Sequence, residues 1–583
     1  MHALKTIPER LPTLWRVIFA IIALALATAS LAAAGLPPPE IAMIVHSQNL
    51  VRHPNERDYQ FVQQRTTLQT RLQWNRATDP TRLRLVKNVR LVLESRASYD
   101  SVYDYTPTFR ERDLRGRRPS RVARRDLADL TPQARAAIRT ELQLRQAYVD
   151  LELRRLPLRF RLGRQQVVWG EADFFRMLDR ANPLDISWHG AQELPPPAFG
   201  WDDLRIPLWM ARAWWIIGTA GPITDIALEA YWNPGDWRPA RVSFLPRPWG
   251  IRLLHPLTNR EDGAFHAPFT GIERLANGSE LFRQGAYSRH PGENSQIGVQ
   301  LTGQVGDLRM GIHYFYQRWA GDDGTPFAPI RGIVDDLPGR LRTQQLIARG
   351  TLPAEYITPH VHTIGISANY FDADWTLATL RVESVLDLDL PLFDRSKATT
   401  LAPLLPGVST RDYWKAMVAM DRAVVPPGFN GSPIFFTWQA YVHHLIGSVR
   451  TLTGPLDLPT AGQRSRPFCG AEPPDPCDDP SGSGSFRDNV HRWEALLTFA
   501  ALTFLRNGAV VPVVGIVLDP VNSYAMNLFW SLDYAWNKHV TLNVTQRFFT
   551  SAQDDIQKGP FDPWNIGTQR GRSETGLRIS YAL

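Results

Sequence analysis

Cysteine is almost missing from this 583-residue sequence, which has two, Cys469 and Cys477, in the stretch CGAEPPDPC. A structural zinc site is therefore not expected, since no third Cys exists and no His lies at ligand spacing from the pair. In an exported protein, two cysteines this close favour one local disulfide that closes a loop. Two separate thiols are the alternative.

Long apolar runs are also missing after residue 34. The longest is GAVVPVVGIVL, Gly508–Leu518, whereas a transmembrane helix needs about 18 apolar residues. The remaining classes are a soluble periplasmic protein, a secreted protein and a membrane β-barrel. No nucleotide-binding motif is present, so any transport is passive or coupled to a partner. No cofactor is expected.

Excess charge is modest. The formal net charge is +8, and removing the two net positive charges of the first 34 residues leaves about +6. This balance gives little support to nucleic-acid binding, and no nucleic-acid partner is expected.

The first 34 residues have the organisation of a secretory signal peptide. Lys5, Arg10 and Arg16 precede an apolar core, Val17–Ala29, and the alanines at 32–34 supply a small-residue cleavage site. The alternative is an uncleaved inner-membrane anchor. The mature chain is expected to start at Gly35, with residues 35–60 as an N-terminal extension or plug and residues 61–583 as one domain.

Aromatic residues, Gly and Pro are abundant, and many segments alternate apolar and polar residues with a period of two, which predicts half-buried strands. Many runs are about ten residues long, as tilted membrane strands are. Seventeen strands are predicted, at 66–76, 83–99, 143–154, 158–168, 205–218, 223–232, 294–304, 307–318, 360–371, 374–386, 410–422, 433–447, 490–505, 509–518, 523–535, 539–549 and 572–583.

Short turns and long polar connections alternate between these strands, which is typical of outer-membrane barrels with short periplasmic turns and long external loops. Bacterial barrels usually have an even strand number, so either one more strand lies between Ile41 and Gln64 or one is over-predicted. The sequence therefore predicts an all-β fold, a transmembrane antiparallel β-barrel of about 16–18 strands, in the outer membrane of a Gram-negative bacterium.

The C-terminal segment GLRISYAL, ending at Leu583, resembles the terminal signal of barrels inserted by the outer-membrane assembly machinery, although the usual final Phe or Trp is replaced by Leu. The assembly machinery and outer-membrane lipids, including lipopolysaccharide, are therefore expected partners. A basic run, Phe109–Arg125, lies in a predicted external loop. It favours either contact with anionic phosphates or a simply solvated loop.

The stretch LGRQQVVWGEADF, Leu162–Phe174, joins a strand to the long connection 169–204. Helical periodicity over Phe174, Met177 and Leu178 follows, among charged residues. Such a segment either folds into the lumen as a constriction or forms an external lid held by ion pairs. The candidate constriction or loop-anchoring residues are Arg164, Trp169, Gly170, Glu171, Asp173, Arg176, Asn182 and Asp185.

The same region resembles a proteobacterial outer-membrane family, domain-of-unknown-function thirteen-oh-two. The matching residues are Tyr148, Asp150, Gly163, Arg164, Gln165, Trp169, Gly170, Glu171, Asn182, Pro183 and Asp185. The segments at 378–385 and 435–444 are similar to later strands of that family. The resemblance implies a large barrel that acts with resistance-nodulation-division-type transporters on hydrophobic or lipid-like compounds. It implies no catalytic residue.

An enzyme is not expected. His443 and His444 have suitable side chains, but no motif supplies a Ser or Asp partner. The predicted function is an outer-membrane channel or transporter for a small, hydrophobic or lipid-like solute, with a periplasmic or inner-membrane transporter as possible partner. The alternatives are a structural or adhesive surface barrel and an outer-membrane hydrolase.

Overall fold

The structure, a computed structural model, describes residues 39–55, 58–78, 84–105, 139–173, 176–184, 202, 204–236, 283–284, 294–319, 330–332, 354–356, 359–397, 407–427, 431–452, 492–521, 524–550 and 573–583. The predicted signal peptide, the basic run 109–125, Asp185 and both cysteines, with their predicted disulfide, lie outside these ranges. Within them, no helix has both the length and the apolar character needed to cross a membrane.

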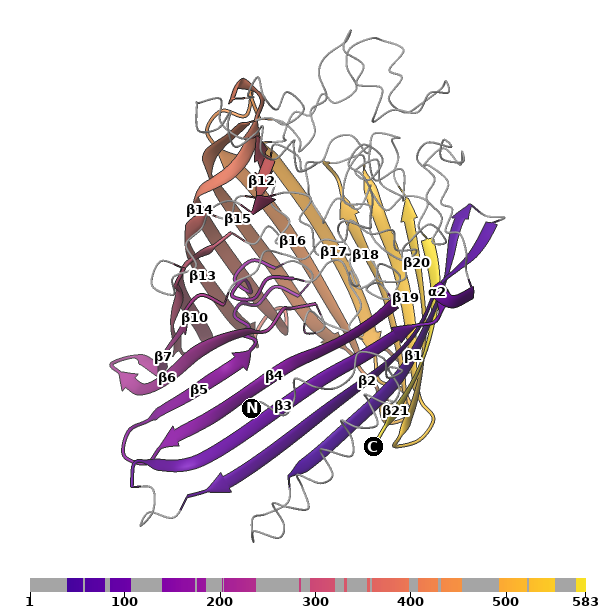
Figure 1. The fold of residues 1–583 in the computed structure, drawn as a ribbon, viewed down its shortest axis with the longest axis horizontal. Coiled ribbons are helices and arrows are strands. Elements are labelled where there is room, and N and C mark those ends of the chain that lie inside the picture. The colour runs from indigo at the N-terminus through magenta and orange to yellow at the C-terminus, as the bar shows by residue number, and fades with distance from the viewer. Residues whose placement is uncertain are drawn as a thin grey trace.

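Eighteen of the described strands form one closed antiparallel barrel (Figure 1). They are β1 (Glu40–Asn55), β2 (Asp58–Ala77), β3 (Val86–Asp100), β4 (Thr140–Leu153), β5 (Leu158–Gln165), β6 (Leu208–Ala220), β7 (Ile223–Asn233), β9 (Gln296–Val305), β10 (Leu308–Arg318), β13 (His360–Asp372), β14 (Ala378–Asp394), β15 (Gly407–Val424), β16 (Ile434–Ile446), β17 (Trp493–Thr503), β18 (Val510–Asp519), β19 (Ala525–Ala535), β20 (Val540–Thr550) and β21 (Ser573–Ala582). The fold class predicted from the sequence is confirmed.

The remaining described elements are short. Strands β8 (Arg283–Gln284), β11 (Ile330–Gly332) and β12 (Ala354–Tyr356) form a separate small sheet. The helical pieces are α2 (Val102–Tyr105) and the 3-10 turn η6 (Arg395–Lys397).

Period-two alternation builds the wall. On β10, Met310 and Ile312 are exposed on the outside, whereas His313 and Phe315 are buried on the inside. On β13, Ile364 and Ile366 are exposed in the same way. An apolar outer face with a polar inner face is the pattern of a transmembrane barrel, because lipid contacts one side only.

All seventeen predicted strands are present, and the eighteenth is β1. Residues 35–60 were expected as an extension or plug, but Glu40–Asn55 instead pairs with both β2 and β21 and closes the barrel. Strand β1 is the further strand that the even strand number had allowed between Ile41 and Gln64. The period-two pattern alone did not show it, because its two faces are alike. His46 and Gln48 are buried on one face, and Ser47 and Asn49 lie on the opposite face.

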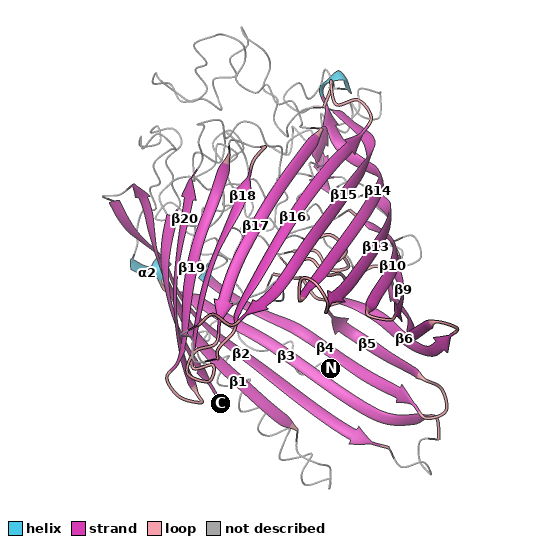
Figure 2. Ribbon diagram, turned by 180° about the vertical axis from the view of Figure 1, so that it is seen from behind, coloured by secondary structure: helices cyan, strands magenta, loops and turns pink. Residues whose placement is uncertain are grey.

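The connections at the end of the barrel that carries the C-terminus are all short (Figure 2). The longest of them, between β15 and β16, covers residues 425–433. At the opposite end, connections such as 101–139 and 234–295 are long. Exceptions at that end are residues 56–57 and 520–524. The alternation predicted from the sequence is therefore present.

Candidate functional site

The chain leaves the wall at the end of β5. Gly163 has a φ of +132°, a region that side chains rarely adopt, and its neighbours leave no room for a Cβ atom. That atom would collide with the carbonyl oxygen of Ala147 on β4 and lie 2.8 Å from the Cα atom of Tyr148. Glycine therefore permits both the close approach of β4 and the change of direction.

The segment that follows, residues 166–184, is called here the inner segment. Its described part runs inside the barrel, where it contacts inward-facing side chains of β7, β10, β13 and β14 (Figure 1). The predicted helical periodicity does not produce a helix in the part that the structure describes, 166–173 and 176–184. Several of its backbone N–H and C=O groups bond to side chains of the wall.

Glu383 on β14 is the main backbone anchor. Its carboxylate accepts N–H bonds from Glu171, from Ala172 at 2.9 Å and from Leu178 at 3.4 Å. Gly170, with a φ of +100°, lets the chain pass this carboxylate, because a Cβ atom there would collide with it. A single fully buried carboxylate thus fixes the turn after Trp169 to β14 of the wall.

Asp387, also on β14, is a second buried anchor. It pairs with Arg180 of the inner segment and with Lys415 of β15, whose Nζ lies 3.0 Å away. Thr363 of β13 donates to Asp387 at 2.6 Å and accepts from Arg180 at 2.7 Å. Two cations around one carboxylate balance the cost of burying it.

A third cluster holds the end of the inner segment to the start of β6. Asp179 accepts from Arg205 at 2.8 Å and lies 3.4 Å from Arg176. The Asn182 side chain accepts from the Val167 amide at 2.7 Å and donates to the Ile206 carbonyl at 2.9 Å. These bonds draw the two ends of the inner segment together.

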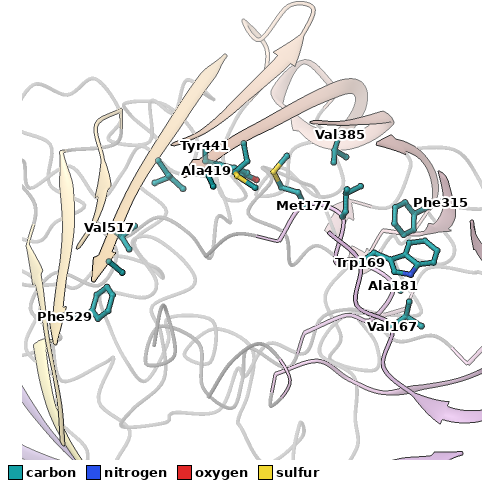
Figure 3. Packing of buried hydrophobic residues seen from close by; sticks show 14 of the residues in the cluster. Val167, Trp169, Met177, Ala181, Phe315, Val385, Ala419, Tyr441, Val517 and Phe529 are labelled. Atoms are coloured by element: carbon teal, nitrogen blue, oxygen red, sulfur yellow. The ribbon is translucent and has the colours of Figure 1, made fainter. Parts of the chain in front are cut away.

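Trp169 is buried among aromatic rings inside the wall. Its ring centroid lies 5.1 Å from that of Phe315 and 5.4 Å from that of Tyr231 (Figure 3). Its indole N–H donates at 2.7 Å to Glu229 on β7, which also pairs with Arg212. The tryptophan is thus held by packing and by a charge-assisted bond.

The exposed edge of the inner segment is acidic. The Asp173 side chain is 56% exposed and pairs with Arg381 at 2.6 Å. Arg381 also pairs with Asp421 of β15 and donates to the Glu171 carbonyl. Asn369 donates to the Glu171 carboxylate at 3.3 Å. Arg381 is therefore bound by two carboxylates and one backbone carbonyl.

The structure brings most of the predicted residues together. Trp169, Gly170, Glu171, Asp173, Arg176 and Asn182 all lie in the inner segment. Arg164 lies apart, next to last in β5, opposite Ala147 and Trp209. Sequence reasoning missed the wall residues that hold the segment: Glu229, Arg381, Glu383, Asp387 and Lys415. The sequence feature that could have identified them is a charged residue at a strand position that faces the lumen.

Two histidines of the inner wall contact side chains of a catalytic type, and at His313 a hydrolytic triad is incomplete. His313 Nε2 lies 3.0 Å from Ser367 Oγ, yet its buried Nδ1 has no hydrogen-bond partner where an orienting acid is needed. His443 contacts Tyr413 and Glu494. Within the described ranges, no three metal-ligating side chains cluster.

Comparisons with solved structures returned outer-membrane barrels of low similarity. Acinetobacter baumannii OccAB4 shares 7% identity over 94% of this chain and 98% of its own, with a TM-score of 0.41. Pseudomonas aeruginosa OccK1 (OpdK) shares 10% sequence identity over 93% of this chain and 98% of its own, with a TM-score of 0.37. Salmonella typhi OmpF, in complex with daunomycin, shares 8% sequence identity over 94% of this chain and 98% of its own, with a TM-score of 0.35. Values at this level transfer no functional property.

No curated protein matched the sequence. A family model did match, over residues 51–474, which is more than half of the chain and includes the inner segment and both carboxylate anchors. The family predicted from the Gly-Arg-Gln and Trp-Gly-Glu residues is thereby confirmed: the chain belongs to the family described as "Protein of unknown function (DUF1302)".

Proposed function

We propose that this protein is an outer-membrane channel whose constriction is the inner segment. The observation that supports this most strongly is the burial of residues 176–184 inside the barrel, where Glu383 and Asp387 of the wall hold them, while Glu229 holds Trp169. A barrel of this size leaves an interior wide enough for a channel unless loops narrow it. An anchored loop is the simplest way to set the width and charge of that passage.

The anchors favour a fixed constriction over a mobile gate. Removing one partner of a buried ion pair costs about 3–5 kcal/mol, because it leaves an uncompensated charge. The inner segment makes such pairs through both Asp179 and Arg180. A gate that opened there would have to break them together.

The solute proposed is small and hydrophobic or lipid-like. The buried apolar cluster inside the barrel supports this class, since it runs from Val167 and Trp169 along the inner wall to Phe529 (Figure 3). The family resemblance also suggests an inner-membrane transporter as partner. Lipopolysaccharide, from the basic run, and the assembly machinery, from the C-terminal segment, are proposed as further contacts. An enzyme role is not proposed; His313, which contacts Ser367, lacks the orienting acid of a triad.

Planar-bilayer recording tests the channel. Asp173→Asn removes a charge from the exposed edge of the constriction, so the reversal potential in a salt gradient is expected to shift toward anions. Asp374→Asn is the matched control, since Asp374 is exposed in the short turn between β13 and β14, outside the lumen. An equal shift in both variants would contradict a constriction at Asp173.

A structural or adhesive surface barrel is the competing function. It predicts no conductance from the purified, folded protein at any voltage. That result would overturn the channel proposal as a whole.

A further inference from the structure

Strand β5 is shorter than a membrane crossing requires. It has 8 residues, whereas a tilted transmembrane strand needs about 9–11. Its ladder with β4 ends at the pair Ala147–Arg164, and its ladder with β6 ends at Gln165–Leu208. Residues 140–146 of β4 continue beyond that point, and β4 is visibly the longer strand in Figure 1. Residues 140–146 of β4 therefore pair with β3 but not with β5.

The backbone around this point is shaped for the departure. Gly163 permits the turn away from β4, as shown above. On the other side of β4, the register with β3 shifts between Glu94 and Ser95, which places an extra residue of β4 next to Leu144. A bulge of this kind bends a strand and increases its twist.

Exposed apolar side chains surround the end of β5. On β4, Leu142 is 68% exposed and Leu144 is 46% exposed. Val168 of the inner segment is 48% exposed, and Trp209 of β6 is 47% exposed. Val168 is notable because both of its chain neighbours are buried. These four residues are called here the apolar rim.

The apolar rim is continuous with the interior. Val167 and Trp169 flank Val168, and both belong to the buried cluster that also contains Leu208, Met210 and Phe315. Val168 of the apolar rim thus lies between two members of this buried cluster, while Arg145 and Gln166 donate hydrogen bonds to the Asp202 carbonyl beside it. A water-filled axial channel has no need of such a connection.

We propose that the end of β5 is a lateral opening, through which an apolar solute passes between the lumen and the hydrocarbon layer of the membrane. The opening lies between residues 140–146 of β4 and the start of β6. The inference rests on the hydrophobic solute class of the proposed function. Its physical basis is that the free energy of an apolar molecule falls when it moves from water into hydrocarbon. Passage from the lumen through the wall into the membrane is therefore favourable.

The test uses N-phenylnaphthylamine, an apolar dye that fluoresces when it reaches the membrane interior, added to intact cells that express the protein. Leu144→Arg places a long charged side chain on the apolar rim and is expected to reduce dye entry to the level of cells without the protein. Leu142→Trp narrows the same place without charge and is expected to reduce entry in part. Ile366→Arg is the matched control, an equally exposed lipid-facing position on β13, and should leave entry unchanged.

Conductance of the same purified variants separates the two proposals. Leu144→Arg should conduct ions like the wild type, which also shows that it has folded. Normal conductance with wild-type dye entry in both rim variants would overturn the lateral opening and leave the channel standing. Equal loss of dye entry in Ile366→Arg would also overturn it. A wild-type protein that conducts no ions would instead refute the proposed function.

Discussion

The Glu383 carboxylate offers the sharpest test of how the inner segment is held. It accepts three N–H bonds, from Glu171, Ala172 and Leu178. In Glu383→Gln, the remaining carbonyl oxygen can still accept the first two, but the new amide donor faces the Leu178 N–H. Losing one charged acceptor and leaving one buried donor unpaired costs about 2–4 kcal/mol of local stability.

About 1.4 kcal/mol corresponds to a factor of ten in an equilibrium constant. The population of the form in which the inner segment is released should therefore rise roughly 30- to 700-fold. Hydrogen exchange followed by mass spectrometry measures this directly, as faster exchange of the amides at 171–178 with no change elsewhere in the barrel. The matched control is Glu152→Gln on β4, whose carboxylate pairs with Lys87 away from the inner segment. Unchanged exchange in Glu383→Gln would refute the anchoring role.

Two further predictions concern barrel stability, measured as the temperature at which the protein loses its folded mobility in detergent gels. Lys415→Met leaves the fully buried Asp387 with one cation instead of two and should lower the free energy of unfolding by about 3 kcal/mol. An unchanged unfolding temperature would contradict the role of the Lys415–Asp387 pair. Gly163→Ala should lower it by more than Gly218→Ala. Both glycines have positive φ, costing about 1–3 kcal/mol, but a Cβ atom at Gly218 meets nothing within 4 Å. Equal losses would mean that the approach of β4 is unimportant.

The barrel could be predicted from the sequence because lipid enforces alternation on most strands. Met310 and Ile312 outside, with His313 inside, show a period that needs no knowledge of neighbours. Strand β1 does not show this alternation, because Ser47 and Asn49 lie on its outer face and neither face is purely apolar.

The position of the inner segment could not be predicted in the same way. Both the lumen and an external lid are compatible with the charges at Asp179 and Arg180. The choice depends on Glu383 and Asp387, which are about 200 positions away in the sequence and meet the segment only when the barrel closes. Their inward positions on β14 mark them as lumen residues but do not name their partners.

The central claim, that the inner segment narrows an open channel, is tested most directly at Asp173. In a protein with Cys469 and Cys477 replaced by Ser, Asp173→Cys is recorded in a planar bilayer before and after reaction with a charged methanethiosulfonate reagent. Attaching a bulky group to this exposed position should reduce the single-channel conductance. Complete labelling by mass spectrometry with an unchanged conductance would contradict the account.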